Sequence, residues 1–241
     1  HLHNMPQAIT AKSFSEVLAH SSSDNIIINL EIEGEGTSLA FLQAIQQGGR
    51  GAVPNLLYLT MADNHMDQEH GRVLGEAIGG GALPELEGLW MGGDESLGDG
   101  GVVPIMAGLE GGGCRHLKKL VMWAVDATGP QGGQALARAL ASGHLSCLQS
   151  LDVAINEDAG DEAMAQVVKG LRECRRLGQL WVERTGMGVM AGRALVQALQ
   201  DKAWPDLEWL IVSGNEHLLS DEGVVVGLVE VLERRADLCP R

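Results

Sequence analysis

The chain has 241 residues, of which 45% are apolar, 20% charged and only 3% aromatic. This apolar fraction excludes a wholly disordered chain, and 33 glycines without a Gly-X-Y period exclude a collagen. The formal net charge of −15 repels phosphate backbones and anionic lipid. We therefore expect no binding to nucleic acid or to a membrane, and if charge steers a partner, that partner is basic.

Residues 1–24 precede the regular part of the chain, and we expect them to form an N-terminal segment with a partial repeat or a cap helix near residues 11–19. The start, residues 1–6, lacks the apolar core of a signal peptide, so we interpret it as a tag remnant, a trimmed end or a fragment boundary. No run of 18 uncharged apolar residues occurs, and the four cysteines include no Cys-x-x-Cys pair. These features favour a reduced, cytoplasmic compartment.

An L-x-x-L-x-L pattern begins at residue 27 and occurs seven times in all, at intervals of 29–31 residues. The apolar triplets are Ile27/Leu30/Ile32, Leu56/Leu59/Met61, Leu86/Leu89/Met91, Leu117/Leu120/Met122, Leu148/Leu151/Val153, Leu177/Leu180/Val182 and Leu207/Leu210/Val212. Side chains alternate along a strand, so each triplet predicts a short strand with one face in the core.

Each strand is followed by a stretch with helical spacing, clearest at residues 71–78, 132–140, 192–199 and 223–232. The position nine residues along each copy carries Asn64, Asp94, Asn156 and Asn215, whereas Glu35, Val125 and Thr185 depart from this preference. A buried Asn there is predicted to satisfy backbone groups where the chain leaves the strand. The Gly79–Gly81 and Gly111–Gly113 clusters are predicted helix ends.

One strand and one helix cannot bury an apolar face alone, so neighbouring copies must stack into a curved solenoid. These repeats resemble the leucine-rich repeat family, and their length and G-x-x-x-L-x-x-A-L tails are similar to its ribonuclease-inhibitor-type subfamily. The resemblance implies an α/β fold: a right-handed horseshoe of about seven repeats, with parallel strands on the concave face and helices on the convex face. It covers residues 25–235, which we expect to be one domain, and leaves 236–241 as a tail.

Aromatic side chains concentrate at the strand positions that point away from the core. These positions hold Tyr58, Trp90, Trp123, Trp181 and Trp209, together with the acids Glu31, Glu33, Asp152 and Glu183 and the single cation Lys119. Tryptophan is the residue most enriched at binding hot spots, so this band is a candidate partner-binding surface. The alternative is that the rings pack over neighbouring strands or are hidden by the curvature. Trp204 precedes the last strand and is predicted to be a packing residue.

Motifs for catalysis are absent from the sequence: there is no phosphate-binding loop, no His-Glu-x-x-His and no Gly-x-Ser-x-Gly. His65 and His70 share a loop with three acids, but such polarity is common on surfaces, and we predict no metal site there. Cys114 and Cys174 occupy equivalent repeat positions, which indicates buried structural thiols. We expect no cofactor, no metal and no catalytic residue.

The sequence thus favours a non-enzymatic protein–protein interaction scaffold, expected to be a monomer, that binds a protein through its concave, acidic and tryptophan-rich face. Two alternatives stay open. One is a GTPase-activating protein similar to the Ran-activating leucine-rich-repeat proteins, although the acidic tail of that family is missing and its catalytic arginine has no matching motif here. The other is the recognition domain of a larger signalling or effector protein.

Overall fold

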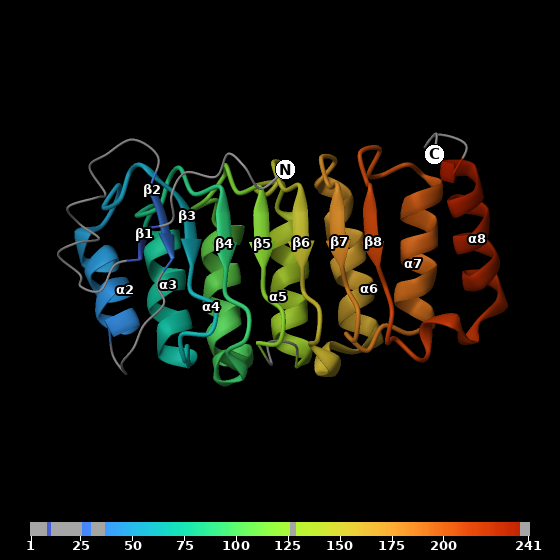
Figure 1. Ribbon diagram of the computed structural model, residues 1–241, viewed down its shortest axis with the longest axis horizontal. Coiled ribbons are helices and arrows are strands. Elements are labelled where there is room, and N and C mark those ends of the chain that lie inside the picture. The colour runs from blue at the N-terminus through green and yellow to red at the C-terminus, as the bar shows by residue number, and fades with distance from the viewer. Residues whose placement is uncertain (1–8, 11–25, 30–36, 126–128, 237–241) are drawn as a thin grey trace.

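A parallel sheet whose eight strands pair in strict chain order runs the length of the molecule (Figure 1). The computed structural model describes residues 9–10, 26–29, 37–125 and 129–236. The strands are β1 (Ile9–Thr10), β2 (Ile26–Asn29), β3 (Leu56–Thr60), β4 (Gly88–Trp90), β5 (Lys119–Val121), β6 (Ser150–Asp152), β7 (Gln179–Trp181) and β8 (Trp209–Ile211). Strand β1 was not predicted. The expected cap helix near residues 11–19 lies outside the described residues.

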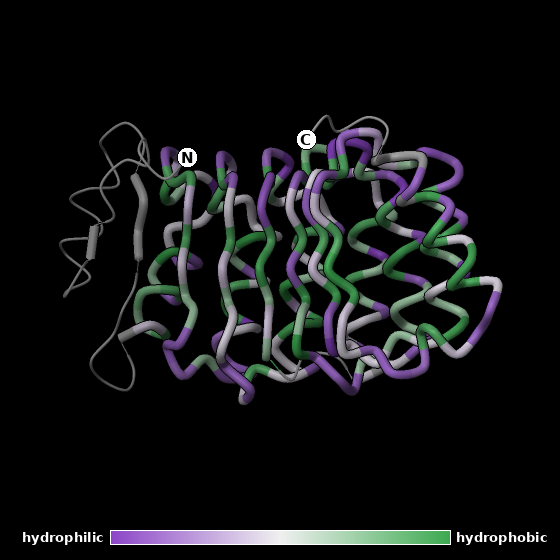
Figure 2. The backbone as a smooth tube through the Cα atoms, turned by 45° about the vertical axis from the view of Figure 1, so that its right-hand side comes forward, coloured by the Kyte–Doolittle hydropathy of each residue, from purple (hydrophilic) through white to green (hydrophobic). Residues whose placement is uncertain are grey.

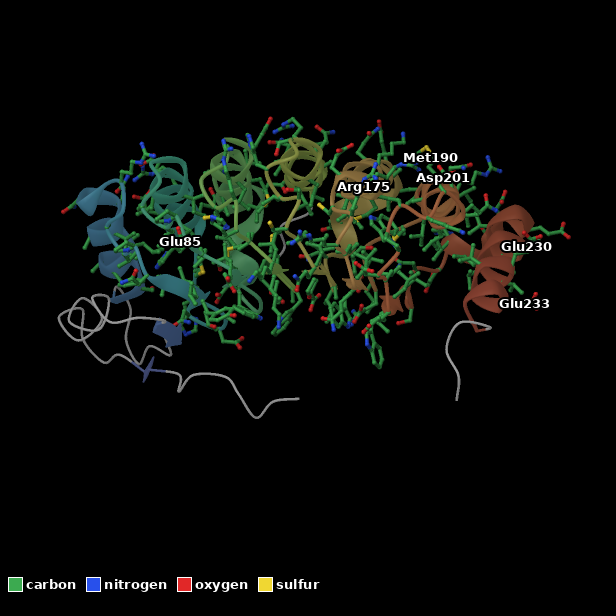
Figure 3. All side chains as sticks on the ribbon, turned by 90° about the horizontal axis from the view of Figure 1, so that it is seen from above. Glu85, Arg175, Met190, Asp201, Glu230 and Glu233 are labelled. Atoms are coloured by element: carbon green, nitrogen blue, oxygen red, sulfur yellow. The ribbon has the colours of Figure 1, made fainter. Side chains whose placement is uncertain are left out.

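A helix follows each strand from β2 onward and packs on one side of the sheet (Figure 1). The helices are α2 (Thr37–Gly48), α3 (Gln68–Gly79), α4 (Gly98–Glu110), α5 (Pro130–Ala141), α6 (Gly160–Gly170), α7 (Val189–Gln200) and α8 (Glu222–Ala236), with short 3₁₀ turns η1 (Glu95–Leu97), η2 (Glu157–Ala159), η3 (Leu171–Glu173) and η4 (Leu218–Ser220). The four helical stretches predicted from the sequence are confirmed as parts of α3, α5, α7 and α8. Seen from above, the helices follow the outside of an arc and the strands its inside (Figure 3).

The core lies between the sheet and the helices, and the leucine triplets fill it. In β3 to β7 and the residues that flank these strands, all three positions of each triplet are at most 1% exposed. Adjacent strands keep one register, so that Leu89, Leu120 and Leu151 form a continuous row. Hydrophilic residues gather in the loops at the two ends of the strands (Figure 2). Within the described ranges, no helix combines the length and apolarity needed to cross a bilayer.

Buried asparagines hold the turns that leave the strands, as predicted. Asn156 is 1% exposed; its amide nitrogen donates to the carbonyls of Met122 and Val153, both at 2.8 Å, and its oxygen accepts from the Val125 amide at 3.2 Å. Asn215 repeats the arrangement after β8, the last strand: its oxygen accepts from the Thr185 amide at 3.0 Å. Each asparagine therefore satisfies backbone groups of its own repeat and of the preceding one.

Candidate partner-binding face

The open face of the sheet carries three rows of side chains, fixed by the strand register. One row contains Tyr58, Gly88, Lys119, Ser150, Gln179 and Trp209, and the next contains Thr60, Trp90, Val121, Asp152, Trp181 and Ile211. Backbone hydrogen bonds just past the strands align the third row, which contains Ala62, Gly92, Trp123, Ala154, Glu183 and Ser213. The predicted aromatic residues all lie in these rows. Glu31 and Glu33 lie outside the described residues.

Tyr58 and Trp90 form an aromatic pair at the N-terminal end of this face. Their ring centroids are 6.0 Å apart with the planes inclined at 53°. A Cβ atom at Gly88 would overlap the Trp90 ring and would come within 2.8 Å of the Tyr58 ring. The missing side chain of Gly88 therefore gives the Trp90 ring room to lie against the strand, which leaves Trp90 only partly exposed.

An ion pair at the start of β5 fixes the Tyr58 hydroxyl. It donates to Glu87 Oε2 at 3.2 Å, and Glu87 Oε1 accepts from Lys118 Nζ at 2.6 Å. Burial, and then the charge of Glu87, raise the pKa of Tyr58, so the hydroxyl stays protonated and acts as a donor at neutral pH. The side chain of Tyr58 is thus held in place before any partner arrives.

Trp123 also lies against backbone rather than projecting from it. A Cβ atom at Gly92, on the neighbouring strand, would overlap the Trp123 indole. The ring therefore covers this glycine and is partly exposed. Packing over a neighbouring strand, the alternative given from the sequence, thus describes Trp123, whereas the Trp90 ring lies against Gly88 of its own strand; both rings keep some contact with solvent. The glycines at these outward positions were the sequence signal for this packing of the rings against backbone.

The C-terminal half of the face is more open and more acidic. Trp209 is 57% exposed on β8, and Trp181 is partly exposed on the adjacent strand β7. Asp152 lies beside Trp181 in the strand register, and its Oδ1 accepts from the Ala154 amide at 3.0 Å. Burial is the main cause that raises the pKa of Asp152, and the charge of Glu183 raises it further.

Trp204, Cys114 and Cys174 are buried, as predicted. Trp204 is fully buried and its indole N–H donates to the Leu171 carbonyl at 2.8 Å. Cys114 and Cys174 are buried, which raises the pKa of each thiol to about 12. Among the described residues, no group of three or more His, Cys, Asp or Glu side chains is placed to hold a metal ion.

A Ser–His–Asp chain joins the first described helices and was missed by the sequence argument. Ser38 Oγ lies 2.8 Å from His70 Nε2, and His70 Nδ1 lies 2.6 Å from Asp67 Oδ1. This connectivity is that of a hydrolytic triad. However, Ser38 is only 3% exposed, and Asp67 and His70 form the capping box of α3. The chain therefore serves to tie the N-terminus of α3 to α2. The Asp-x-x-His spacing was the signal for this cap.

Comparison with known proteins identifies no family for the chain. No family model and no curated protein matches the chain. Among solved structures, it is similar to the C-terminal domain of tropomodulin from Caenorhabditis elegans, with a TM-score of 0.48 and 10% identity over 64% of this chain and 86% of that domain. A likeness this distant carries no argument about activity, so function has to be argued from the side chains themselves.

Proposed function

We propose that the chain is a non-enzymatic scaffold that binds a protein partner on the concave face of its sheet. The observation that carries this proposal is the exposed ring of Trp209, at 57%, beside the partly exposed Trp181 on the next strand. Large aromatic rings left in water on a preformed surface are typical of interaction hot spots. The acids Asp152 and Glu183 on the same half of the face favour a basic partner.

The proposal includes the finer identity of the fold. The alternation of parallel strand and helix, the leucine rows and the asparagines at the turns support ribonuclease-inhibitor-type leucine-rich repeats, about seven in number and wound with a right hand. A stacked solenoid of this kind is rigid before it binds, so little conformational entropy opposes association. We further propose that residues 25–235 act as one domain and that the chain is a monomer in the cytoplasm.

The test compares the Trp181→Ala and Trp209→Ala variants with Met190→Ala, which removes an apolar side chain, 53% exposed, on the helical side of the molecule (Figure 3). Proteins captured from lysate are identified, purified and titrated against each variant by calorimetry. We expect each tryptophan variant to bind about 30-fold more weakly and Met190→Ala to bind normally. A captured protein that binds all three variants like the unaltered chain contradicts the proposal.

A further inference from the structure

One oxygen on the partner-binding face is buried without a hydrogen bond. Glu183 Oε2 has no contact with solvent and no donor in the described part of the chain. A carboxylate oxygen removed from water normally accepts a bond, and leaving it unsatisfied is costly. The guanidinium nearest in sequence, that of Arg184, already donates to Glu157, with its Nε at 2.8 Å. Glu183 as a whole is partly exposed, so a rotation of its side chain can present this acceptor to a donor from outside the chain.

A second carboxylate lies diagonally across from it. Asp152 on β6 pairs with Trp181 on β7, and Glu183 follows two residues later, so the two acids occupy neighbouring strands. Burial is the main cause of the raised pKa of Asp152, and the charge of Glu183 contributes in the same direction. None of the ion pairs among the described residues involves either acid. Two partly buried negative charges thus face the open side of the sheet without a compensating cation.

The indole of Trp181 adds a surface on which a planar cation can stack. Trp181 is on the same strand as Glu183 and is the register neighbour of Asp152. A guanidinium is planar, carries five N–H donors and stacks on aromatic rings, so it can donate to two carboxylates while it covers an indole. An ammonium is a point charge that cannot do both. A divalent cation would need more ligands than these two acids supply.

We propose that Asp152 and Glu183, with Trp181 beside them, form a socket for an arginine side chain of the protein partner. The socket deepens the proposed function and rests on it, because it names the group that the concave face recognises. Its site on the face is offset from the aromatic pair at Tyr58, where the ion pair with Lys118 already neutralises Glu87. On this half of the face, a positive charge of the partner is therefore stabilised most at the socket.

The direct test uses three blocked pentapeptides that differ only in a central arginine, citrulline or lysine. Citrulline keeps the shape of arginine and lacks its charge. The side-chain carboxyl signals of the unaltered protein are followed by NMR during each titration. We expect the arginine peptide to shift the signals of Asp152 and Glu183 saturably, and the citrulline peptide to bind at least about tenfold more weakly. Equal binding of arginine and citrulline peptides, or no saturable shift with arginine, overturns the socket.

Variants separate failure of the socket from failure of the proposed function. Asp152→Asn and Glu183→Gln should each weaken the arginine peptide about tenfold, whereas Asp158→Asn, an equal loss of charge at an exposed residue outside the face, should not. If both socket variants bind the arginine peptide normally, the socket is wrong. If Trp209→Ala no longer binds the captured partner but both socket variants still do, the partner-binding face is supported and the socket is not. Normal partner binding by all these variants overturns both.

Discussion

Asp152 shows how a proposed binding residue can work against the stability of its own fold. Burial and the charge of Glu183 raise the pKa of Asp152. The folded state therefore binds this proton more tightly than the unfolded state does. The associated stability is present in acid and is lost as the pH rises through the raised pKa. At neutral pH the ionised carboxylate consequently destabilises the native state.

We predict that Asp152→Asn raises the melting temperature at neutral pH, because the amide keeps the oxygen that accepts from Ala154 and removes the charge. Its advantage over the unaltered chain should shrink as the pH falls from neutral into acid through the raised pKa of Asp152, because the aspartate itself then becomes protonated. Circular-dichroism melts across this range measure the difference, with Asp158→Asn as the control. A lower melting temperature for Asp152→Asn at neutral pH contradicts this account.

Asn156, in contrast to Asp152, stabilises the fold, because its side-chain hydrogen bonds are structural. Replacing it with Ala leaves the carbonyls of Met122 and Val153 and the Val125 amide without their partner in a buried turn. We expect a loss of about 3 kcal/mol in the free energy of unfolding, measured by urea denaturation. Asp158→Ala, at an exposed neighbouring residue, should change the free energy of unfolding by no more than a few tenths of that loss. A loss below about 1 kcal/mol for Asn156→Ala would show that water replaces the side chain.

At single positions, the sequence predicted the roles of residues that recur from repeat to repeat. It missed the features that depend on neighbouring side chains. Asn156 and Asn215 recur at one repeat position, so their role could be inferred from spacing. The positions of the Trp90 and Trp123 rings depend on glycines at other outward sites, one of them on another strand. The unsatisfied oxygen of Glu183 depends on which donors its neighbours have already engaged, and no periodicity encodes that.

Helices in this solenoid are capped from the preceding repeat as well as by their own residues. Gly188, the N-cap of α7, has no side chain to accept a bond. Asp161, in the first turn of α6, instead accepts from the amides of Gly188, Met190 and Ala191 at 2.7 to 2.9 Å. Asp99 of α4 does the same for the Gly132 amide of α5, at 2.9 Å.

Asp161→Ala is therefore expected to destabilise the chain by about 2 kcal/mol, because it removes the acceptor for three amides of the next helix. Glu162→Ala alters the same turn of α6 but leaves these amides bonded, and it should cost a few tenths of a kcal/mol. Urea denaturation of both variants makes the comparison. Equal losses for the two would mean that Asp161 acts through the α6 dipole alone.

The core of the solenoid is less completely buried near β8 than in the preceding strands. The triplet residues Leu210 and Val212 are partly exposed, whereas their counterparts in the five preceding strands are buried. Leu219, Val226 and Val229, near and on α8, are 48 to 60% exposed. The repeated leucine pattern predicted that one face of every strand lies in the core, but burial also requires a neighbour on each side. Position in the stack therefore decides how much each repeat contributes to stability.

Two backbone amides at the same repeat position test whether stability falls from the middle of the stack toward β8. Met91 N–H donates to the Val121 carbonyl and Val182 N–H donates to the Ile211 carbonyl, both at 2.9 Å. The bonds are alike, but the second ends on β8, whose own apolar side chains are partly hydrated. Native-state hydrogen exchange should therefore show Val182 opening with a lower free energy than Met91, because β8 and α8 can detach while the middle of the stack stays folded. Exchange of both amides at the free energy of global unfolding would mean that the stack opens only as a whole.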